Sequence, residues 1–557
     1  HIQNPITKLQ AFPFLSVSLS MIQKLKGSGR RILTFPAVHP CLKISPSTLL
    51  SSILNLSHSI CNFKSKFFAS NKRNAREAIR LVGVLQIFLE EIRDEQSNLL
   101  DSVVIAFCEL HLVFQKLQFL LEDCTREGAQ VWMLMESENV ANQFRVSARS
   151  IATALDILPL DSIEVSMELK EHFELVMRQS RKARFEVDPD DKRAAMDVVS
   201  TLKQFENGIF PSDIDLKRVL DHIGIRTWSE CNKEVKFLDS EIGLECLNEE
   251  KIKVAWLSSL MGFMNYCRCV VFDVVKGEGD QQSDGRGSSR DSEVLASLNP
   301  YDFRCPISLE LMSEPVTILS GHTYDRSSIL KWFKGGNVNC PKTGQRLNNT
   351  KWVPNLVLQR LIQQYCSEKG ISIADQGRRN RDATRTVHPG SLAAKEAMKM
   401  LASFLAYRLE TGVGEERNGA AYEFRLLSKA NIFNRSCLVE AGCIQHLLKL
   451  LSSKDSSTQE NAIASLLNIS KHSKSITVIV ENRGLELIVD VLKKGMKVEA
   501  RQHAAATLFY LASIEEYRRL IGETTEAIPA LIELIKDGTD RAKKNALVAM
   551  FGLLMEP

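Results

Sequence analysis

Two short stretches carry residues whose types and spacing could bind a metal ion. They read CPISLE at 305–310 and CPKTGQ at 340–345. Each begins like a C-P-x-C knuckle, in which two cysteines hold one zinc ion, but Ser308 and Thr343 occupy the places of the second cysteines. A structural zinc site needs four Cys or His ligands in a tetrahedron. The two loops are therefore poor zinc sites, and other interactions must hold them.

The wider stretch 298–371 resembles a RING finger, whose pattern assigns eight ligand positions to two zinc ions. Here these positions fall on Cys305, Ser308, Ser320, His322, Asp325, Ser328, Cys340 and Thr343. One set of four would offer a single thiolate, and the other one thiolate and one imidazole, so no metal is expected. The hydroxyls and the carboxylate that replace the ligands predict a hydrogen-bond network. Each bond would contribute about 1 kcal/mol, and more where a charge takes part.

We expect a small apolar core to supply much of the remaining stability. Its candidate members are Phe303, Leu311, Val316, Ile329 and Leu361. The thiols of Cys305 and Cys340 are expected to be inert, because no sequence feature places a general base beside either one and a buried cysteine packs like a small apolar residue. A cysteine-based transfer mechanism is the disfavoured alternative.

The stretch resembles the U-box, the zinc-free relative of the RING finger found in ubiquitin ligases. The resemblance rests on several separated motifs, namely CPIS, EPV, GHTYDR, CPKTGQ and a PN pair followed by apolar residues. It implies that the chain binds a ubiquitin-conjugating enzyme charged with ubiquitin and forms no covalent intermediate. Catalysis would then come from proximity and from restriction of the thioester to a reactive geometry.

The resemblance also assigns a docking surface for the conjugating enzyme. Its residues are Ile307 and Leu309 in the first loop, Trp332 on the central helix and Pro341 in the second loop. A shallow apolar patch with one Trp suits an interface dominated by a few residues; the alternative is that Trp332 only packs in the core. Some relatives place an Arg or Lys after the second loop as a bridge to ubiquitin. Here Gly344 occupies that position, and Arg346 is the candidate substitute.

The chain of 557 residues is long enough for roughly three to four domains. Periodicity and the resemblance predict a mainly α fold: an N-terminal helical bundle, a small α+β U-box and a C-terminal armadillo-type solenoid. The expected ranges are 1–45 for a leader and disordered N-terminus, 46–275 for the helical domain, 276–297 for a linker, 298–372 for the U-box, 373–390 for a second linker and 391–557 for the repeats.

The N-terminal region has apolar residues at helical spacing. The stripe consists of Ile79, Val82, Leu85, Leu89 and Ile92, separated by three- and four-residue steps. One apolar stripe per helix is typical of an amphipathic helix that buries one face against its neighbours. A bundle of long helices is therefore expected.

The C-terminal region repeats every 42 residues. Alanine recurs at Ala420, Ala462, Ala504 and Ala546, each followed by apolar residues four and seven positions later. Helical repeats of this length indicate an armadillo or HEAT array, and the segment NAIASLLNIS resembles armadillo repeats. The fourth repeat reaches the chain end without a polar cap, so we expect that the array is C-terminally truncated.

Bulk composition excludes several classes of function. The net charge is only +4, from 71 basic and 67 acidic residues, so no nucleic-acid partner is expected. No G-x-x-x-x-G-K-[ST] loop is present for a nucleotide. The 13 cysteines have no framework spacing, which predicts reduced thiols in the cytoplasm and/or nucleus. No transmembrane segment is expected, because the best candidate, from Ala255, contains Asn265, Arg268 and Asp273.

Two segments outside the domains resemble targeting signals. The stretch AFPFLSVSL from Ala11 is similar to a short signal-peptide core, but Met21 opens a second start. We therefore expect residues 1–20 to be leader sequence without a targeting role. The second linker contains Arg378, Arg379, Arg381 and Arg385, and a solvated connector is favoured over a basic address.

As a whole, the chain resembles a plant U-box/armadillo ubiquitin ligase. The resemblance implies that the armadillo repeats recruit a protein substrate for ubiquitination and that 46–275 is the family's U-box N-terminal domain, through which some members engage exocyst subunits. It also implies a role in stress or defence signalling, recruitment to membranes through partners, and a U-box-mediated dimer; no cofactor is expected. The alternative is a non-catalytic interaction adaptor that keeps the U-box only as a fold.

Overall fold

The structure is a computed structural model of the chain. It describes residues 30–40, 44–94, 103–158, 167–247, 251–272, 303, 305–307, 311–334, 338–341, 345–368, 391–430, 432–471 and 473–554. Both expected linkers, with their arginines, and the segment from Ala11 lie outside these residues. The chain forms two compact units, His1–Val199 with Lys217–Arg226, and Ser200–Leu216 with Thr227–Pro557.

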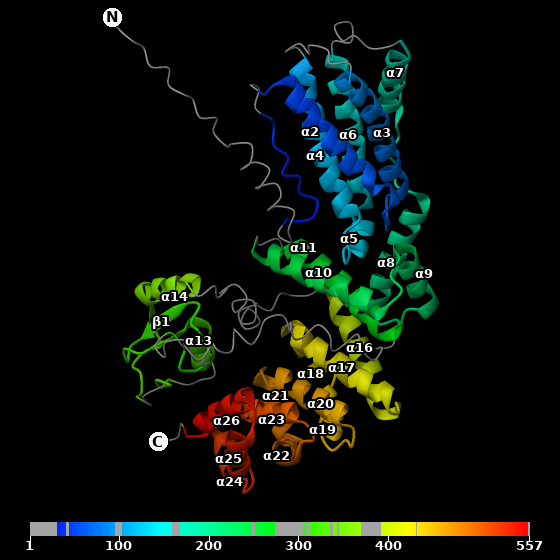
Figure 1. Cartoon of the computed structure of the whole chain (residues 1–557). Helices are drawn as coiled ribbons and strands as arrows, with labels where there is room; N and C mark the ends of the chain where they lie inside the picture. The colour runs from blue at the N-terminus through cyan, green and yellow to red at the C-terminus, as the bar shows by residue number, and fades with distance from the viewer. Residues whose placement is uncertain are drawn as a thin grey trace, which may run out of the picture. The chain divides into compact units, whose positions relative to one another are not determined.

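The first unit is built on a helical bundle, in which α2, α3, α4 and α6 lie side by side (Figure 1). Its helices are α2 Pro46–Cys61, the 3₁₀ turn η1 Asn62–Ser65, α3 Lys72–Asp94, α4 Val104–Cys124, α5 Gln130–Met135, α6 Ser137–Ile157 and α7 Met167–Lys182; α8 Pro189–Glu206 and α9 Asp213–Ile223 pass into the second unit. The predicted stripe from Ile79 to Ile92 is buried along α3. The sequence therefore predicted the inward face of this helix correctly.

The expectation of a disordered N-terminus is wrong for residues 30–40. These residues form no helix or strand, yet they lie against α4 and hydrogen-bond to it at two places. The side chain of Ile32 is buried. A segment without helix or strand has no apolar periodicity, and its order depends on contacts with residues far along the chain, so the local sequence could not reveal it.

One helix among the described residues, α4, is long and apolar enough to cross a bilayer. It is not the segment from Ala255 that the sequence singled out. Of its most apolar window, 72% is buried inside the protein. A core helix of a soluble protein passes the same length and composition test, so the finding is weak support for a membrane span.

The U-box region holds a three-stranded antiparallel sheet in the order β2-β1-β3 and two helices. The elements are β1 Pro315–Ile318, β2 Thr323–Asp325, α13 Arg326–Lys334, β3 Trp352–Pro354 and α14 Leu356–Glu368. Val316 on β1 is opposite Tyr324 on β2 and Pro354 on β3. The turn between β1 and β2 contains Gly321 with φ +79°, a conformation that glycine adopts without steric cost.

The C-terminal region is an array of three-helix repeats. After α16 Leu392–Thr411 and α17 Glu415–Ala430, the helices are α18 Ile432–Glu440, α19 Cys443–Leu450, α20 Ser456–Ile469, α21 Ser473–Glu481, α22 Gly484–Lys494, α23 Val498–Leu511, α24 Glu515–Glu523, α25 Ala527–Asp537 and α26 Asp540–Leu553. In each repeat two shorter helices precede a helix of 14 residues, which fits the three-helix armadillo arrangement. The predicted armadillo-type solenoid is confirmed.

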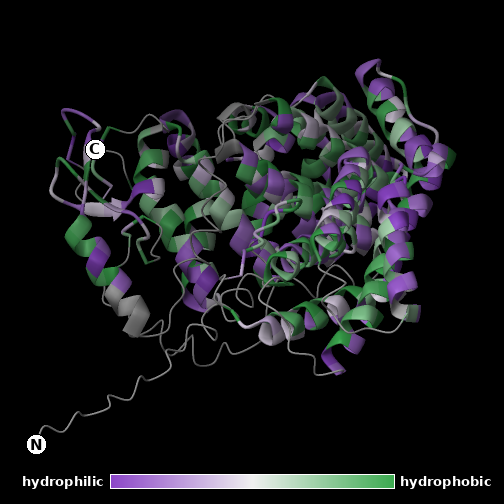
Figure 2. Ribbon diagram, turned by 90° about the horizontal axis from the view of Figure 1, so that it is seen from above, coloured by the Kyte–Doolittle hydropathy of each residue, from purple (hydrophilic) through white to green (hydrophobic). Residues whose placement is uncertain are grey.

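The last helices of successive repeats, α17, α20, α23 and α26, stack one against the next. Each carries one of the alanines spaced by 42 residues, and all four alanines are buried. A small side chain lets neighbouring helices approach closely, which explains why alanine marks the repeat. Coloured by hydropathy, many helices carry both hydrophobic and hydrophilic residues along their length (Figure 2).

Two further helices of the second unit, α10 Trp228–Leu247 and α11 Lys251–Val270, pack against the start of the array. A Cβ added to Gly262 of α11 would lie 3.1 Å from the Cα of Ala394 in α16, so the two backbones are in close contact. Ser259 also hydrogen-bonds to Ser391, the N-cap of α16. The helices α11 and α16 are therefore neighbours, although the whole U-box lies between them in the sequence.

A buried ion pair joins α11 to the next helix of the array, α17. Arg268 of α11 donates from Nη2 to Oε2 of Glu423 in α17 at 2.6 Å, and its Nη1 donates to Asn232 at 3.0 Å. The indole N–H of Trp228 donates to the other oxygen of Glu423. Arg268, Glu423 and Trp228 are all buried. The range 46–275 stays a prediction of the domain boundary, but its last two helices pack with the repeats.

Candidate functional site

The U-box has a compact apolar core. Its buried members include Cys305, Leu311, Val316, Tyr324, Ile329 and Cys340, and Phe303 packs partly buried against them. The prediction of Leu361 as a core residue is wrong, because its side chain is 47% exposed while the next residue, Ile362, is buried. A shift of one position along a helix turns a side chain by about 100°, which moves it from the core to the surface.

Asp325, at the end of β2, is buried and accepts several hydrogen bonds. Its Oδ1 accepts from the backbone N–H of Ser313 at 2.9 Å, from the hydroxyl of Ser313 at 3.0 Å and from the N–H of Glu314 at 3.1 Å. Its Oδ2 accepts from the hydroxyl and the N–H of Ser327 at 2.6 and 3.2 Å. One carboxylate thus fastens the loop before β1 to the start of α13.

A second polar cluster surrounds Cys340. The hydroxyl of Ser320 donates to Sγ of Cys340 at 3.0 Å, and the phenol oxygen of Tyr324 lies 3.1 Å from the same sulfur. Nδ1 of His322 lies 3.1 Å from the backbone oxygen of Ser320. The cluster holds the β1–β2 turn against the second loop, where the resemblance to a RING finger would place a metal ion.

The structure therefore groups the eight ligand-like positions in part. It brings Ser320, His322 and Cys340 together; Asp325 uses other partners, Cys305 and Ser328 are buried, and Ser308 and Thr343 lie outside the described residues. Sequence reasoning missed Ser313, Tyr324 and Ser327. The hydroxyl side chains close to Asp325 along the chain could have indicated these partners. The backbone N–H donors could not, because every residue other than proline has one.

No group of three or more His, Cys, Asp or Glu residues with metal-binding geometry occurs in the part of the chain that the structure describes. Zinc-free stability of the U-box remains a prediction, which a chelator can test. The ten cysteines whose side chains the structure describes are free thiols.

The predicted docking residues lie at different depths. Ile307 and Trp332 are half-buried and pack against the apolar core. The indole N–H of Trp332 donates to the backbone oxygen of Asn339 at 2.8 Å, which ties α13 to the second loop. Pro341, in that loop, is buried, and Arg346 is exposed. Leu309 and Gly344 lie outside the described residues.

Comparison with protein families identifies the three regions. The U-box domain family matches residues 300–371, the PUB10-like N-terminal domain matches 72–184, and the armadillo/β-catenin-like repeat matches 434–471. The fold and the matched domains define a U-box protein with armadillo repeats.

Full-length relatives agree with this class. U-box domain-containing proteins 19 and 18 of Arabidopsis thaliana are 47% and 45% identical to the chain, and each alignment covers 96% of this chain and 78% of the relative. U-box domain-containing protein 1 of Medicago truncatula is 32% identical over 81% of this chain and 70% of its own length. The chain belongs to the plant U-box domain-containing proteins, a family of ubiquitin ligases.

Solved structures add little. A computationally designed armadillo repeat protein for modular peptide recognition is 20% identical and covers 34% of this chain and 86% of its own, with a TM-score of 0.26. A TM-score this low does not show that the two chains share their overall structure.

Proposed function

We propose that the chain is an active ubiquitin ligase whose U-box docks a ubiquitin-charged conjugating enzyme. The observation that supports this most directly is the pair of half-buried apolar side chains, Ile307 and Trp332, on the U-box core. Partial burial leaves each side chain a rigid apolar surface, and such preorganised residues can dominate an interface. The hydrogen bond of Trp332 to Asn339 fixes the indole in place before any partner arrives.

The transfer itself needs no nucleophile from this chain. A lysine amine of the substrate attacks the thioester carbonyl of the charged conjugating enzyme, the C–S bond breaks, and the enzyme's thiol leaves as the isopeptide bond forms. The U-box would contribute proximity and a restricted thioester geometry. Arg346 is exposed, as a bridge to ubiquitin requires, and we propose it for that role.

We further propose that the armadillo repeats hold the substrate. The stacked helices α17, α20, α23 and α26 form one continuous face, and arrays of this kind bind extended partners on such a face. Charge reversal of exposed residues there should lower transfer to substrate while leaving self-ubiquitination unchanged.

The experiment that tests docking is self-ubiquitination of the purified chain with activating enzyme, several conjugating enzymes, ATP and ubiquitin. Trp332→Ala and Ile307→Lys should abolish the formation of ubiquitin chains. Trp352→Ala is the matched control, because Trp352 is also a partly buried Trp on the same core but belongs to β3. All variants are first shown to be folded by thermal melting.

Equal loss of activity in folded Trp332→Ala and Trp352→Ala would mean that activity depends on the packing of the whole U-box core and not on docking through Trp332. No chain formation with any conjugating enzyme from a folded wild type would instead support the non-catalytic adaptor.

A further inference from the structure

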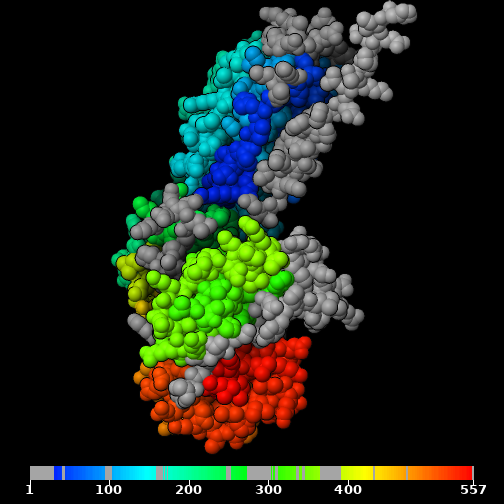
Figure 3. All heavy atoms as spheres, turned by 90° about the vertical axis from the view of Figure 1, so that its left-hand side faces the viewer, coloured from blue at the N-terminus to red at the C-terminus, as the bar shows by residue number. Residues whose placement is uncertain are grey.

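Residues 30–40 contact the N-terminal bundle as a peptide ligand contacts its receptor. They contribute no helix or strand, and residues 41–45 separate them from α2. Figure 1 shows this segment in dark blue beside the bundle, and in Figure 3 dark-blue atoms lie directly against the cyan helices. We call residues 30–40 the strap. Its hydrogen bonds to the bundle fall mainly on α4, at two places.

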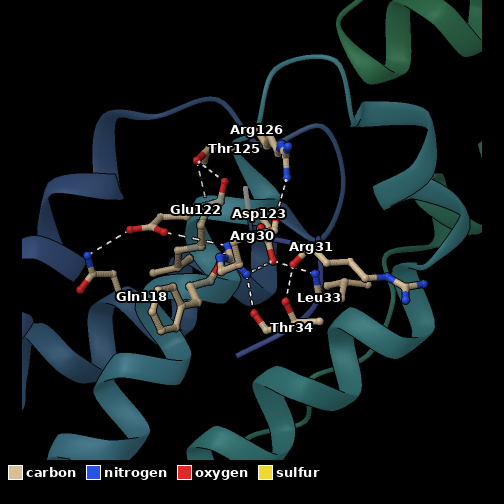
Figure 4. A network of polar contacts seen from close by, with 11 residues as sticks. Arg30, Arg31, Leu33, Thr34, Gln118, Glu122, Asp123, Thr125 and Arg126 are labelled. Carbon is tan, nitrogen blue, oxygen red and sulfur yellow. Dashed lines mark hydrogen bonds and ion pairs between the residues drawn. The ribbon is translucent and has the colours of Figure 1, made fainter. Parts of the chain in front are cut away.

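The first contact is an arginine site at the end of α4 (Figure 4). The guanidinium of Arg30 makes two parallel hydrogen bonds to the carboxylate of Asp123, at 2.5 and 3.0 Å. It also donates to the backbone oxygen of Phe119 at 3.3 Å and lies 4.9 Å from the centre of the Phe119 ring. Such a two-pronged pairing with an aromatic face beneath it selects arginine over lysine.

The environment of Asp123 explains why this site favours a cation. The side chain of Asp123 is 1% exposed and that of Arg30 11% exposed. Burial raises the pKa of the Asp123 carboxyl, and the hydrogen bonds and charge of Arg30 oppose that rise. Without the guanidinium of Arg30, the buried carboxylate would keep the N–H of Leu33 and the charge of Arg126 but would lose its bidentate partner.

The strap also adopts a backbone conformation that α4 stabilises. Leu33 has φ +56°, a left-handed conformation that costs a non-glycine residue of order 1–3 kcal/mol. Its N–H donates to Oδ2 of Asp123 at 2.9 Å. The same carboxylate therefore binds a side chain and, three residues later, a backbone donor. Between them, the side chain of Ile32 is buried.

The second contact joins the side chain of Gln115 on α4 to the backbone of Val38 in the strap. Oε1 of Gln115 accepts from the N–H of Val38 at 3.1 Å, and Nε2 of Gln115 donates to the oxygen of Val38 at 3.0 Å. The side-chain amide thus pairs with one residue of the strap as a neighbouring strand would. The side chain of Val38 is 59% exposed, so this contact does not select a residue type. Gln115 is held by His111, whose Nδ1 lies 2.7 Å from Nε2.

We propose that this face of α4 is a binding surface for a peptide segment that carries an arginine, and that the strap occupies it in cis. The ligand class has an arginine, a buried apolar residue two positions later, and a free backbone N–H and carbonyl eight positions after the arginine. The strap is then a built-in competitor, and a partner segment of the same class binds only when the strap leaves.

The test uses the full chain with a specific protease site in place of residues 41–43. After cleavage, only this surface holds the strap, so a fluorescent peptide of residues 30–40 in excess should exchange onto it saturably. The uncleaved chain should bind the peptide at least tenfold more weakly, because a tethered competitor has a high effective concentration. Circular dichroism before and after cleavage establishes that the bundle stays folded.

Matched peptides locate the recognition. Arg30→Ala in the peptide should weaken binding at least tenfold, whereas His39→Ala, at an exposed position, should bind like the parent. Asp123→Asn in the chain should reduce the preference for arginine. The proposal is overturned if the cleaved, folded chain takes up no peptide, if the Arg30→Ala peptide binds equally well, or if cleavage unfolds the bundle, since the strap would then be an integral part of the fold.

Discussion

Two buried carboxylates stabilise different regions of this chain in different ways. In the described part of the U-box, Asp325 is paired with neutral donors, the hydroxyls and N–H groups of residues at most 12 positions away. Glu423 in the array is paired with the cation of Arg268 and the indole of Trp228, which lie 155 and 195 positions away. Both carboxylates are about equally buried.

The difference reflects what each carboxylate joins. Asp325 joins the loop before β1 to the start of α13 within a small domain. Its donors are close along the chain, so bringing them together loses little conformational entropy. Glu423 joins helices on either side of the U-box in the sequence, and a buried pair with an arginine requires both ions to lose water. We therefore expect loss of one donor from the local network to lower stability little, whereas loss of one partner of the long-range ion pair should destabilise every helix that the pair joins.

The largest effect should follow from breaking the ion pair. Arg268→Ala leaves the carboxylate of Glu423 buried and uncompensated, and should cost about 3–5 kcal/mol of stability. Hydrogen exchange at α11, α16 and α17 measures the loss. The double variant Arg268→Met with Glu423→Leu should recover much of it, because no buried charge remains. If Arg268→Ala lowers the free energy of unfolding by less than about 1 kcal/mol, the ion pair behaves like an exposed one and does not hold these helices together.

A smaller, confined effect is expected in the U-box. Asp325→Ala removes every acceptor of the local network and should cost about 2–3 kcal/mol. Exchange should rise in β1, β2 and α13, while α17 and α20 keep the protection of the wild type. Spread of the change into the array would show that the two regions are coupled and not independent.

The two polar clusters of the U-box should themselves differ. Ser327→Ala removes a hydroxyl that donates to a carboxylate and should cost about 1.5 kcal/mol, whereas Ser320→Ala removes a donor to a sulfur and should cost about 0.5 kcal/mol. Urea denaturation of both variants, followed by the fluorescence of Trp332 and Trp352, gives the comparison. The reverse order would mean that the cluster around Cys340 carries more of the fold.

No effect is expected from removing metal. A strong zinc chelator should leave the melting temperature of the U-box and the self-ubiquitination rate unchanged, because hydrogen bonds occupy the places of the ligands. A fall in either quantity, restored by added zinc, would show that a metal ion contributes after all.

The sequence predicted most of the fold because most of it is periodic. The alanines spaced by 42 residues and the stripe on α3 reveal helices and their buried faces directly. The motifs of the U-box predicted its core except for the slip between Leu361 and Ile362. The missed features all depend on backbone groups or distant partners: the donors to Asp325, the strap on α4, and the packing of α10 and α11 on the array.

The contact between α11 and α16 has a consequence for the reach of the U-box. The chain leaves the helical body at the end of α11 and returns to it at Ser391, which touches Ser259 about three helical turns before that end. The shorter connection, residues 369–390, can span at most about 75 Å when fully extended. The U-box therefore works within a bounded sphere around Ser391. If substrate is held on the array, the length of residues 369–390 sets the local concentration of charged conjugating enzyme. Only substrate lysines within the reach of this connection can then receive ubiquitin.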